Sequence, residues 1–538
     1  MSTKTWSKYQ EAIFQAIESG SGNLAVNAVA GSGKTTTIVE AANRFPRSKR
    51  VVFLAFNKHI VQELRDRLPR DVDCMTIHSL GMKATGKGTQ ARLQVEAHKY
   101  ADLIDALVAA NQSVPSQVHG VFAKLVRQIV DLGRLTLTDF KVQEQVDDLI
   151  DHYDMAADLV DAANDMEADI DVLLAMAVRT ARESMKQGMT QYRDHGIIDF
   201  TDMLWIPYVF KLAVPRYDVV MVDEAQDLSR AQLEIVLKAA GSFGRMVAVG
   251  DPRQAIQGFA GADNESFAKL VARTNAKVLP LSVCYRCPVT HLELAREIVP
   301  TIEAAPNAAA GVVEYIDEGR FASMPRPGDL IICRTNAPLV PAALRLIAKG
   351  IQARVRGRNI GQAIAKIAED AAKVEVDYSI QAQGWRVAFT AQIEKYGQIR
   401  REALEQRKHS EAAIEALNDQ LDALVVYLDS KPEIGSLSDL TRGIADLFAD
   451  EGAAVWCSSI HRSKGLEADR VFVLKPDKMA LSFKNMLPWQ AEQEQNLRSV
   501  GLTRAKQYMY FVEEGGSVAQ VAQAIQAAAQ DDDADLPF

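Results

Sequence analysis

Residues 24–35, LAVNAVAGSGKT, constrain the fold of this chain most, because an apolar run leads directly into a glycine-rich loop. Gly31 and Gly33 allow backbone conformations that point successive N–H groups at one anion. The residues that follow have the apolar spacing of a helix, whose positive N-terminal end favours the same anion. Lys34 is placed to reach the terminal phosphates of a nucleotide, and the Thr35 hydroxyl to ligate Mg²⁺. The segment therefore predicts a strand, a phosphate-binding loop and a helix.

A second motif, VVMVDEAQD at residues 219–227, supplies the carboxylates that such a loop lacks. Asp223 and Glu224 follow an apolar run directly, which places them at the carboxyl end of a sheet strand, where parallel sheets form their ligand sites. Asp223 is expected to hold Mg²⁺, directly or through water, and Glu224 to activate the attacking water. The phosphate loop departs from the full pattern at Ala28, where a glycine is usual. Together the two motifs predict nucleotide hydrolysis.

Further apolar runs alternate with helical segments along both halves of the chain. VVFLAF and MVAVGD accompany the first two motifs, and LIIC, VFVL and YMYFV follow in the second half. Continuous apolar strands separated by helices indicate parallel sheets that are covered on both faces. Helical spacing dominates residues 86–195 and 357–450. A helix–helix seam is predicted within the second of these segments, formed by Ile414, Leu417, Leu421, Leu424 and Leu428.

We therefore expect an α/β protein with two parallel-sheet domains, each carrying a mostly helical insertion. The first domain combines residues 1–85 and 196–280, and its insertion covers residues 86–195. The second domain combines residues 281–356 and 451–515, with a reduced insertion at residues 357–450. Residues 516–538 form a C-terminal tail with an acidic tip.

The net charge limits how this chain could bind nucleic acid. Its 538 residues carry a formal net charge of −9. A protein that coats DNA is normally basic, because neutralised phosphates drive non-specific affinity. Any binding to nucleic acid is therefore expected to be confined to a groove. Five scattered cysteines suit a reducing cytosol, and no apolar run approaches the roughly 20 residues that span a bilayer, so no membrane partner is expected.

Nine segments in a fixed order carry a family resemblance. Beside the two motifs above, they are YQEAIFQAI, FLAFNKHI, CMTIHSL, VAVGDPRQAIQGFAGAD, LSVCYRC, SSIHRSKGLEADRVFVL and EQNLRSVGLTRAKQYMYFV. Together they resemble the ordered motif set of UvrD/Rep-like superfamily 1 DNA helicases, and AFNK and TIHSLG are most similar to the F-box DNA helicase branch. The resemblance spans residues 10 to about 512 and accounts for Ala28, since alanine is common there in this family.

The resemblance implies two RecA-like domains, with ATP and Mg²⁺ bound in the cleft between them. Gln10 would read the adenine edge and Tyr285 would stack on its ring. Gln254 would sense the γ-phosphate, which Arg286 and Arg504 would reach from the second domain. An arginine in such a position stabilises the charge that develops during phosphoryl transfer.

The remaining nucleotide contacts are implied by position in the same motifs. Glu467 would contact the ribose, and Gly465 would help to shape that wall. Within the loop the contacts fall on Ala30, Gly31, Ser32, Gly33, Lys34, Thr35 and Thr36.

The family also implies a path for single-stranded DNA, with 3′→5′ movement and binding at junctions between single and double strands. Aromatic side chains that stack on bases contribute about 1–3 kcal/mol each without reading the sequence. A narrow track of this kind is compatible with the acidic net charge. The matching positions are Phe56, Thr76, His78, Phe259, Arg334, Asn336 and His461.

Two features carry alternative interpretations. Cys284 and Cys287 have the C-x-x-C spacing of a metal or redox site, although the residues between them belong to the nucleotide motif. The end of the chain, QDDDADLPF, is similar to the tip by which bacterial single-stranded-DNA-binding proteins recruit partners. It is either a solvated tail, a site for a replication or repair partner, or an arm that folds onto the DNA groove.

The expected function is that of an ATP-dependent DNA helicase or translocase acting on single strands in DNA replication, repair or recombination. We expect it in the cytoplasm of a bacterial or phage-infected cell, associated with the nucleoid when bound to DNA. The alternative is a DNA-stimulated ATPase that displaces proteins from DNA without separating the strands.

Overall fold

The computed structural model describes residues 5–164, 166, 168–258, 261, 265–405, 410–448, 455–483 and 486–513. Its contacts divide the chain into two units, residues 1–283 and residues 284–538. Within the described residues each unit is built on a six-stranded sheet whose neighbouring strands all run parallel. The predicted α/β class with two parallel sheets is therefore confirmed.

The sheet of unit 1 places the strand before the phosphate loop next to one edge. In order across the sheet, its strands are β3 (Val72–Thr76), β2 (Val51–Ala55), β6 (Val219–Val222), β7 (Arg245–Gly250), β1 (Leu24–Ala28) and β8 (Lys277–Leu281). Because the strands are parallel, the segments that follow β1, β6 and β7 all leave from the same edge.

Neighbouring residues of each strand enter different cores, as β2 shows. Val51 and Phe53 pack into one core, whereas Val52 and Leu54 pack into the other. The first core includes α1 (Lys8–Glu18), α2 (Lys34–Asn43) and α3 (Lys58–Arg65); the second includes α4 (Ile77–Thr85), α10 (Asp202–Val209) and α11 (Arg230–Ala240). The sheet is thus covered on both faces, as continuous apolar strands require.

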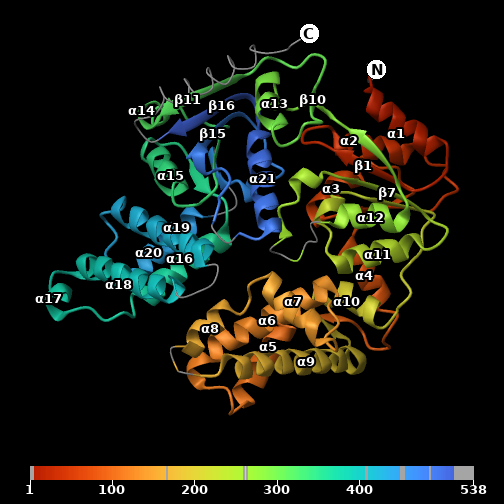
Figure 1. Cartoon of the computed structure of the whole chain (residues 1–538). Coiled ribbons are helices and arrows are strands. Elements are labelled where there is room, and N and C mark those ends of the chain that lie inside the picture. The colour runs from red at the N-terminus through yellow and green to blue at the C-terminus, as the bar shows by residue number, and fades with distance from the viewer. Residues whose placement is uncertain are drawn as a thin grey trace, which may run out of the picture. The chain divides into compact units, whose positions relative to one another are not determined.

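The insertion of unit 1 is a group of packed helices (Figure 1) that shares a hydrophobic core with α4, α10 and α11. They are α5 (Lys99–Ala110), α6 (His119–Thr136), α7 (Gln143–His152), α8 (Ala157–Asn164) and α9 (Ile170–His195). The two-residue strands β4 (Gln94–Val95) and β5 (Ile197–Ile198) pair in parallel, so the insertion begins and ends at one place. The insertion is mostly helical, and the short strand β4 is the exception within residues 86–195.

The sheet of unit 2 has the order β11 (Val312–Asp317), β16 (Ala505–Glu513), β15 (Ala468–Leu474), β12 (Leu330–Cys333), β14 (Val455–Ser459) and β13 (Ala353–Val355). Its flanking helices include α13 (Val289–Arg296), α14 (Glu318–Phe321), α15 (Leu339–Ala348) and α21 (Pro488–Leu502). The chain leaves the described part of this unit at the end of β16.

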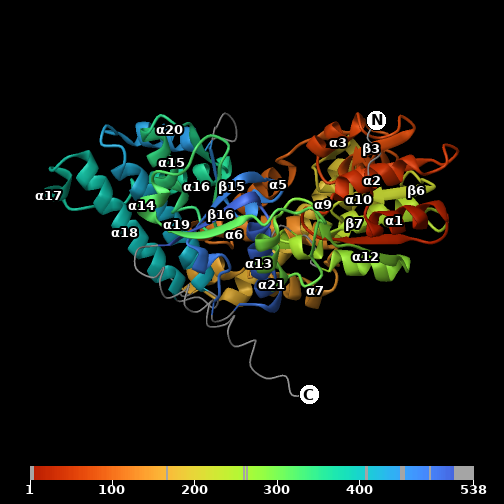
Figure 2. The same cartoon turned by 90° about the horizontal axis from the view of Figure 1, so that it is seen from above.

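The insertion of unit 2 lies between β13 and β14. It contains α16 (Arg358–Ala371), α17 (Tyr378–Gln381), α18 (Trp385–Glu405), α19 (Ser410–Asp429) and α20 (Leu437–Leu447), and α18 and α19 lie side by side in both views (Figure 1 and Figure 2). The predicted seam is confirmed, since its four leucines are buried and Ile414 packs against them. No helix among the described residues combines the length and apolar character needed to cross a membrane.

Candidate nucleotide and nucleic-acid sites

The phosphate loop joins β1 to α2, as predicted. Gly31 has a φ of 65° and Gly33 a φ of 78°, which are left-handed conformations that favour glycine. A Cβ at Gly33 would meet its nearest neighbour, Gln10 Nε2, only at 4.0 Å, so conformation rather than space requires glycine there. Ala28 is the last residue of β1 and its φ is not positive, so this position does not require glycine.

The other loop residues are fixed from within the loop. Ser32 is buried and its Oγ donates to the Val29 carbonyl at 2.8 Å, while Ala30 is buried beside it. Thr35 and Thr36 lie partly exposed in the first turn of α2. The N–H groups of that turn have no partners within the helix, so this end of α2 can receive an anion.

Gln10 lies against the loop from α1. Its side-chain Oε1 accepts from the Ser7 N–H at 3.0 Å, and its Nε2 donates to Thr37 Oγ1 at 3.0 Å. Gln10 therefore caps its own helix and joins it to α2 beside the glycine loop. Its adenine contact stays a prediction.

The sheet brings the acidic motif to the phosphate loop. Lys34 Nζ lies 3.8 Å from Glu224 Oε1, and the Glu224 N–H donates to Asp223 Oδ1 at 2.9 Å. Asp223 is buried at the end of β6. Residues from two motifs almost 200 positions apart thus form one cluster, because β6 and β1 both border β7.

The electrostatics of this cluster favour a cation. Burial alone would lower the pKa of Lys34, but the carboxylates of Glu224, Asp251, Asp223 and Asp227 raise it above its ordinary value. Burial first, and then the neighbouring Glu224 carboxylate, raises the pKa of Asp223 to about 7. The cluster holds more carboxylates than its lysine can balance. Mg²⁺ is usually held by one or two carboxylates together with phosphate oxygens, so Asp223 and the Thr35 hydroxyl fit this ion.

Two buried residues that the sequence analysis missed complete the cluster. The Gln226 Nε2 donates to Glu224 Oε2 at 2.6 Å, and its Oε1 accepts from the Asp251 N–H at 2.8 Å. The Gln254 Nε2 then donates to Asp251 Oδ2 at 2.5 Å. A continuous chain of hydrogen bonds therefore joins Gln254, the predicted phosphate sensor, to Glu224. The two missed residues are Gln226 in the DEAQD segment and Asp251 in the GDPRQ segment. Each lies within three positions of a predicted residue, and this closeness was the signal that could have identified them.

In unit 2, Arg286 and Glu467 form an ion pair. The Arg286 Nε donates to Glu467 Oε2 at 2.6 Å, and Lys506 Nζ lies 2.7 Å from Glu467 Oε1. Although burial opposes it, these two cations lower the pKa of the Glu467 carboxyl. Glu467, predicted as the ribose contact, therefore holds the predicted arginine in place. Lys506 was not predicted.

Arg504 is almost fully buried. Its Nε donates to the Val500 carbonyl at 2.7 Å, and its Nη1 to the Leu466 carbonyl at 3.1 Å. Gly465 next to Leu466 has a φ of 85°, and the Tyr285 ring is about half exposed (49 %), as a stacking platform requires. The predicted roles of Arg504, Gly465 and Tyr285 stay predictions.

The candidate DNA contacts of unit 1 gather at one edge of its sheet. Phe56 follows β2, Thr76 ends β3, and His78 lies in the first turn of α4. Ala55 and Thr76 are register partners on neighbouring strands, which brings these positions together. The Thr76 side chain caps α4 by accepting from the Ser79 N–H at 3.2 Å, so its position is structurally fixed. Phe259 lies outside the described residues.

Arg334 of unit 2 is paired within its own unit. Its Nε and Nη2 donate to the two carboxylate oxygens of Glu494 at 2.9 and 2.5 Å. Glu494 lies in α21, is buried, and also accepts from the Leu481 N–H at 2.9 Å. This bidentate pair fixes the guanidinium plane just after β12.

His461 opens the turn after β14, the strand that neighbours β12. Burial, and then the positive charges of Arg334 and Arg462, lower the pKa of His461 to about 3. Its ring is therefore neutral at pH 7, and any DNA contact it makes would be a stacking or hydrogen-bonding contact rather than an ion pair.

Asn336 is held by an acidic residue of the helical insertion. Asp419, in α19, accepts from the Asn336 N–H at 2.7 Å, from Asn336 Nδ2 at 3.2 Å and from the Ala337 N–H at 2.5 Å. Asp419 is nearly buried. Nothing in the sequence around it indicated that it would bind the loop after β12. The insertion therefore fixes the loop that follows β12.

Comparison with known proteins agrees with this geometry. Residues 9–274 match the UvrD/REP helicase N-terminal domain family. F-box DNA helicase protein 1 of Schizosaccharomyces pombe is 23% identical over 530 residues, which are 90% of this chain and 54% of that protein. F-box DNA helicase 1 of Gallus gallus is 27% identical over 239 residues, covering 44% of this chain and 22% of the relative.

A bacterial helicase is also similar in sequence. The ATP-dependent DNA helicase PcrA of Leuconostoc citreum is 23% identical over 313 residues, which are 53% of this chain and 38% of that protein. This chain thus spans about half the length of the Schizosaccharomyces pombe relative and less of the others. The predicted resemblance is confirmed: residues 9–274 match the UvrD/REP helicase N-terminal domain family, and the chain is similar to F-box DNA helicases and to PcrA.

Proposed function

We propose that this chain is an ATP-hydrolysing DNA helicase or translocase that moves 3′→5′ along single-stranded DNA. The observation that carries the proposal is the cluster of Lys34, Asp223 and Glu224 beside a glycine-rich loop, at the carboxyl edge of a parallel sheet, in a UvrD/REP-like chain. We place its work in DNA replication, repair or recombination, in the cytoplasm of a bacterial or phage-infected cell and at the nucleoid.

The residues of unit 1 support the hydrolytic step. Lys34 stays charged and is placed to neutralise the terminal phosphates of ATP. Thr35 and Asp223 would hold Mg²⁺, which supplies charge neutralisation of the phosphate oxygens. Glu224 would accept a proton from the attacking water, with Gln226 fixing the orientation of its carboxylate.

The residues of unit 2 are proposed to serve the same reaction. Arg286 and Arg504 would stabilise the charge that develops on the γ-phosphate, and Glu467 would release Arg286 to contact the ribose. Tyr285 would stack on the adenine whose edge Gln10 reads. We propose the single strand to run over the edge residues of each unit, among them Phe56 in unit 1 and the loop after β12 in unit 2.

An ATPase assay with and without single-stranded DNA tests the proposal. Lys34→Ala is expected to lower hydrolysis by about 10²–10³-fold, because the phosphate charge loses its stabilisation. Lys49→Ala, an exposed lysine of the same unit, is the control and should leave hydrolysis unchanged. If single-stranded DNA does not stimulate ATP hydrolysis by the wild-type protein, the proposal of a DNA motor is contradicted.

Strand separation distinguishes the two candidate functions. The proposal predicts unwinding of a duplex with a 3′ single-stranded tail and none of a duplex with a 5′ tail. DNA-stimulated hydrolysis that removes a bound protein from DNA but separates neither duplex would instead support the remodelling ATPase.

A further inference from the structure

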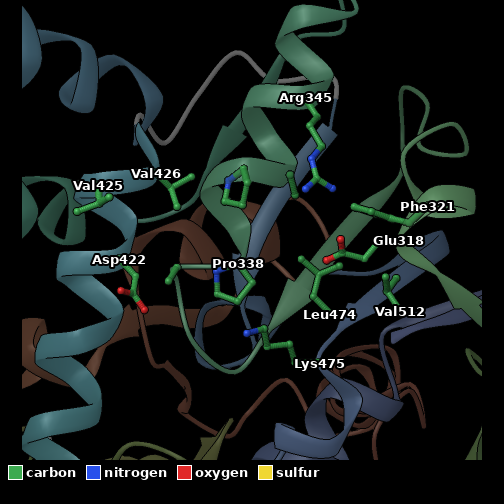
Figure 3. Close-up of a pocket in the computed structure, with 13 residues that line it drawn as sticks. Glu318, Phe321, Pro338, Arg345, Asp422, Val425, Val426, Leu474, Lys475 and Val512 are labelled. Atoms are coloured by element: carbon green, nitrogen blue, oxygen red, sulfur yellow. The ribbon is translucent and has the colours of Figure 1, made fainter. Parts of the chain in front are cut away.

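A mainly apolar cavity of about 340 Å³ lies within unit 2 (Figure 3). Phe321 and Val512 line one side of it, opposite residues of α15 and α19. The charged residues around it are two cations and two acids, namely Arg345, Lys475, Glu318 and Asp422. Because these charges balance, they favour no single class of ligand. The C-x-x-C pair of the same unit has a more specific chemistry.

Cys284 and Cys287 form this pair, and the structure brings their side chains together. Cys284 ends the short strand β9 (Val283–Cys284), and Cys287 lies just before α13. Both thiols are free and buried, and the Cys287 N–H donates to Cys284 Sγ at 3.4 Å. Among the described residues, no group of three or more His, Cys, Asp or Glu side chains could hold a metal ion. The pair thus lacks the further ligands of a metal site, which favours the redox interpretation of the motif.

The two thiols differ in acidity. A hydrogen bond from the Cys287 thiol, helped by the N–H groups of Cys287 and Arg286, lowers the pKa of Cys284 to about 7 although burial opposes the shift. The same hydrogen bond, and then burial, raises the pKa of the Cys287 thiol. Near pH 7 a large fraction of Cys284 is therefore thiolate, the nucleophilic form, beside a protonated partner.

The pair encloses Tyr285 and Arg286, two of the proposed nucleotide contacts. The Arg286 Nη1 donates to the Thr503 carbonyl at 3.4 Å, and the Cys287 Sγ donates to the same oxygen at 3.6 Å. The Cys287 thiol therefore shares an acceptor with the guanidinium of Arg286. Any change in the bonding of Cys287 alters the immediate surroundings of this arginine.

We propose that Cys284 and Cys287 form a reversible dithiol–disulfide pair that controls the position of Arg286. Disulfide formation itself is independent of the proposed function, whereas its effect on ATP hydrolysis rests on that function. In reducing compartments, disulfides of this kind are transient and serve catalysis or redox sensing.

Hydrogen peroxide is the oxidant that fits a buried pair, because it is little larger than water and can enter during local opening of the loop. The Cys284 thiolate attacks one peroxide oxygen, so that an S–O bond forms, the O–O bond breaks and hydroxide leaves. The Cys287 sulfur then attacks the Cys284 sulfur. An S–S bond forms, the S–O bond breaks, and the departing hydroxide takes the Cys287 proton as water. The hydroxide of the first step takes the proton that Cys284 had released, so two thiols and one peroxide give one disulfide and two waters.

The disulfide changes the loop that carries Arg286. Its sulfurs lie about 2.0 Å apart, closer than hydrogen-bonded atoms, and Cys287 no longer has a proton to donate to the Thr503 carbonyl. Because Arg286 lies inside the closed ring and shares that carbonyl, its guanidinium is displaced. A misplacement of about 1 Å can cost about 10²-fold in rate, so the oxidised chain is expected to hydrolyse ATP about 10–10²-fold more slowly. A dithiol reductant reverses the change by thiol–disulfide exchange.

Peptide mapping of the full chain tests the disulfide. The chain is treated with hydrogen peroxide, the remaining thiols are blocked with iodoacetamide, and the protein is digested with trypsin. Trypsin cleaves after Arg286, so a Cys284–Cys287 disulfide joins two peptides that dithiothreitol separates. The expected result is this linked pair, together with slower ATP hydrolysis that dithiothreitol restores.

Serine variants make the effect specific, each compared with its own untreated form. Cys284→Ser is expected to keep its rate of ATP hydrolysis after peroxide treatment, because Cys287 alone forms no disulfide and its thiol is protonated. Cys74→Ser, which removes a partly exposed thiol of unit 1, should lose hydrolysis as the wild type does.

Three results would overturn the inference. These are peroxide-treated wild type without the linked peptides, a linked chain that hydrolyses ATP as fast as the reduced chain, and equal loss of hydrolysis in Cys284→Ser and wild type. The peptide map requires neither ATP nor DNA. A reduced chain that does not hydrolyse ATP therefore contradicts the proposed function, while the map still decides whether the disulfide forms.

Discussion

Glu224 illustrates how this site depends on single residues. It has a φ of 50°, which few residues other than glycine adopt, and the strain persists because its backbone and side chain are both bonded. The turn directs its carboxylate to within 3.8 Å of Lys34 rather than along the strand. A residue with this fixed orientation suits a general base.

Glu224→Gln is therefore expected to lower ATP hydrolysis by about 10²–10⁴-fold while ATP binding persists, because the amide keeps the shape but accepts no proton. Steady-state ATPase rates and binding of a fluorescent ATP analogue separate the two effects. Glu11→Gln, an exposed residue of α1, is the control. Unchanged hydrolysis in Glu224→Gln would exclude this residue as the base.

At the scale of elements, a buried ionic cluster joins the insertion of unit 1 to its sheet domain. Arg134 of α6 donates to both oxygens of Asp199, at 2.9 and 2.8 Å, and to Asp202 at 3.1 Å. Lys99 of α5 lies 2.5 Å from Asp202, and the Tyr100 ring lies beneath the Arg134 guanidinium, whose Cζ is 3.9 Å from the ring centroid. Buried charges of this kind are tolerated only when all are paired.

Removing one partner should be costly for this reason. Asp202→Ala is expected to lower the free energy of unfolding by about 3–5 kcal/mol, because Lys99 and part of Arg134 would remain buried and uncompensated. Urea denaturation followed by circular dichroism measures the loss. Lys124→Ala, which breaks an exposed pair with Asp158, should cost about 0–1 kcal/mol. Equal losses in the two variants would contradict the role of burial.

The second insertion acts on a candidate DNA contact through Asp419. Asp419→Ala should weaken single-strand binding about tenfold, because the loop that carries Asn336 loses its three hydrogen bonds. Fluorescence anisotropy with a labelled oligonucleotide measures the affinity, and ATPase without DNA should not change. Asp422→Ala, an exposed aspartate of the same helix, is the control. If Asp419→Ala binds single-stranded DNA with unaltered affinity, this loop does not contribute to DNA binding.

At the scale of the whole molecule, the proposed reaction needs residues of both units. The phosphate loop and the acid pair belong to unit 1, and Arg286 belongs to unit 2. If hydrolysis depends on residues of both units, ATP turnover would be coupled to the relative movement of the units, as a motor requires.

Arg286→Ala is accordingly expected to lower hydrolysis by about 10³-fold, although the residue is in the other unit from the phosphate loop. Its removal should change the unfolding of unit 2 little, since its partner Glu467 keeps Lys506. Arg498→Ala, which breaks an exposed pair with Glu297, is the matched control. A wild-type rate in Arg286→Ala would show that unit 1 hydrolyses ATP without this arginine.

The sequence by itself determined the parts of this protein that are local. A strand, Gly31, Gly33 and a helix are contiguous, so their order already specifies a phosphate loop. Asp223 and Glu224 follow an apolar strand, and the carboxyl ends of parallel strands lie at one edge. The α/β class, the helical seam of α19 and the family resemblance followed from such contiguous patterns.

Only the tertiary structure decided which distant side chains meet. The Gln226–Asp251 bridge, the Glu494 partner of Arg334 and the Asp419 contact with Asn336 each join residues from different elements. The buried cluster around Arg134 and the apolar cavity beside Val512 arise in the same way. Such contacts depend on how helices pack on a sheet, and the spacing of residues along one element carries no information about a partner on another.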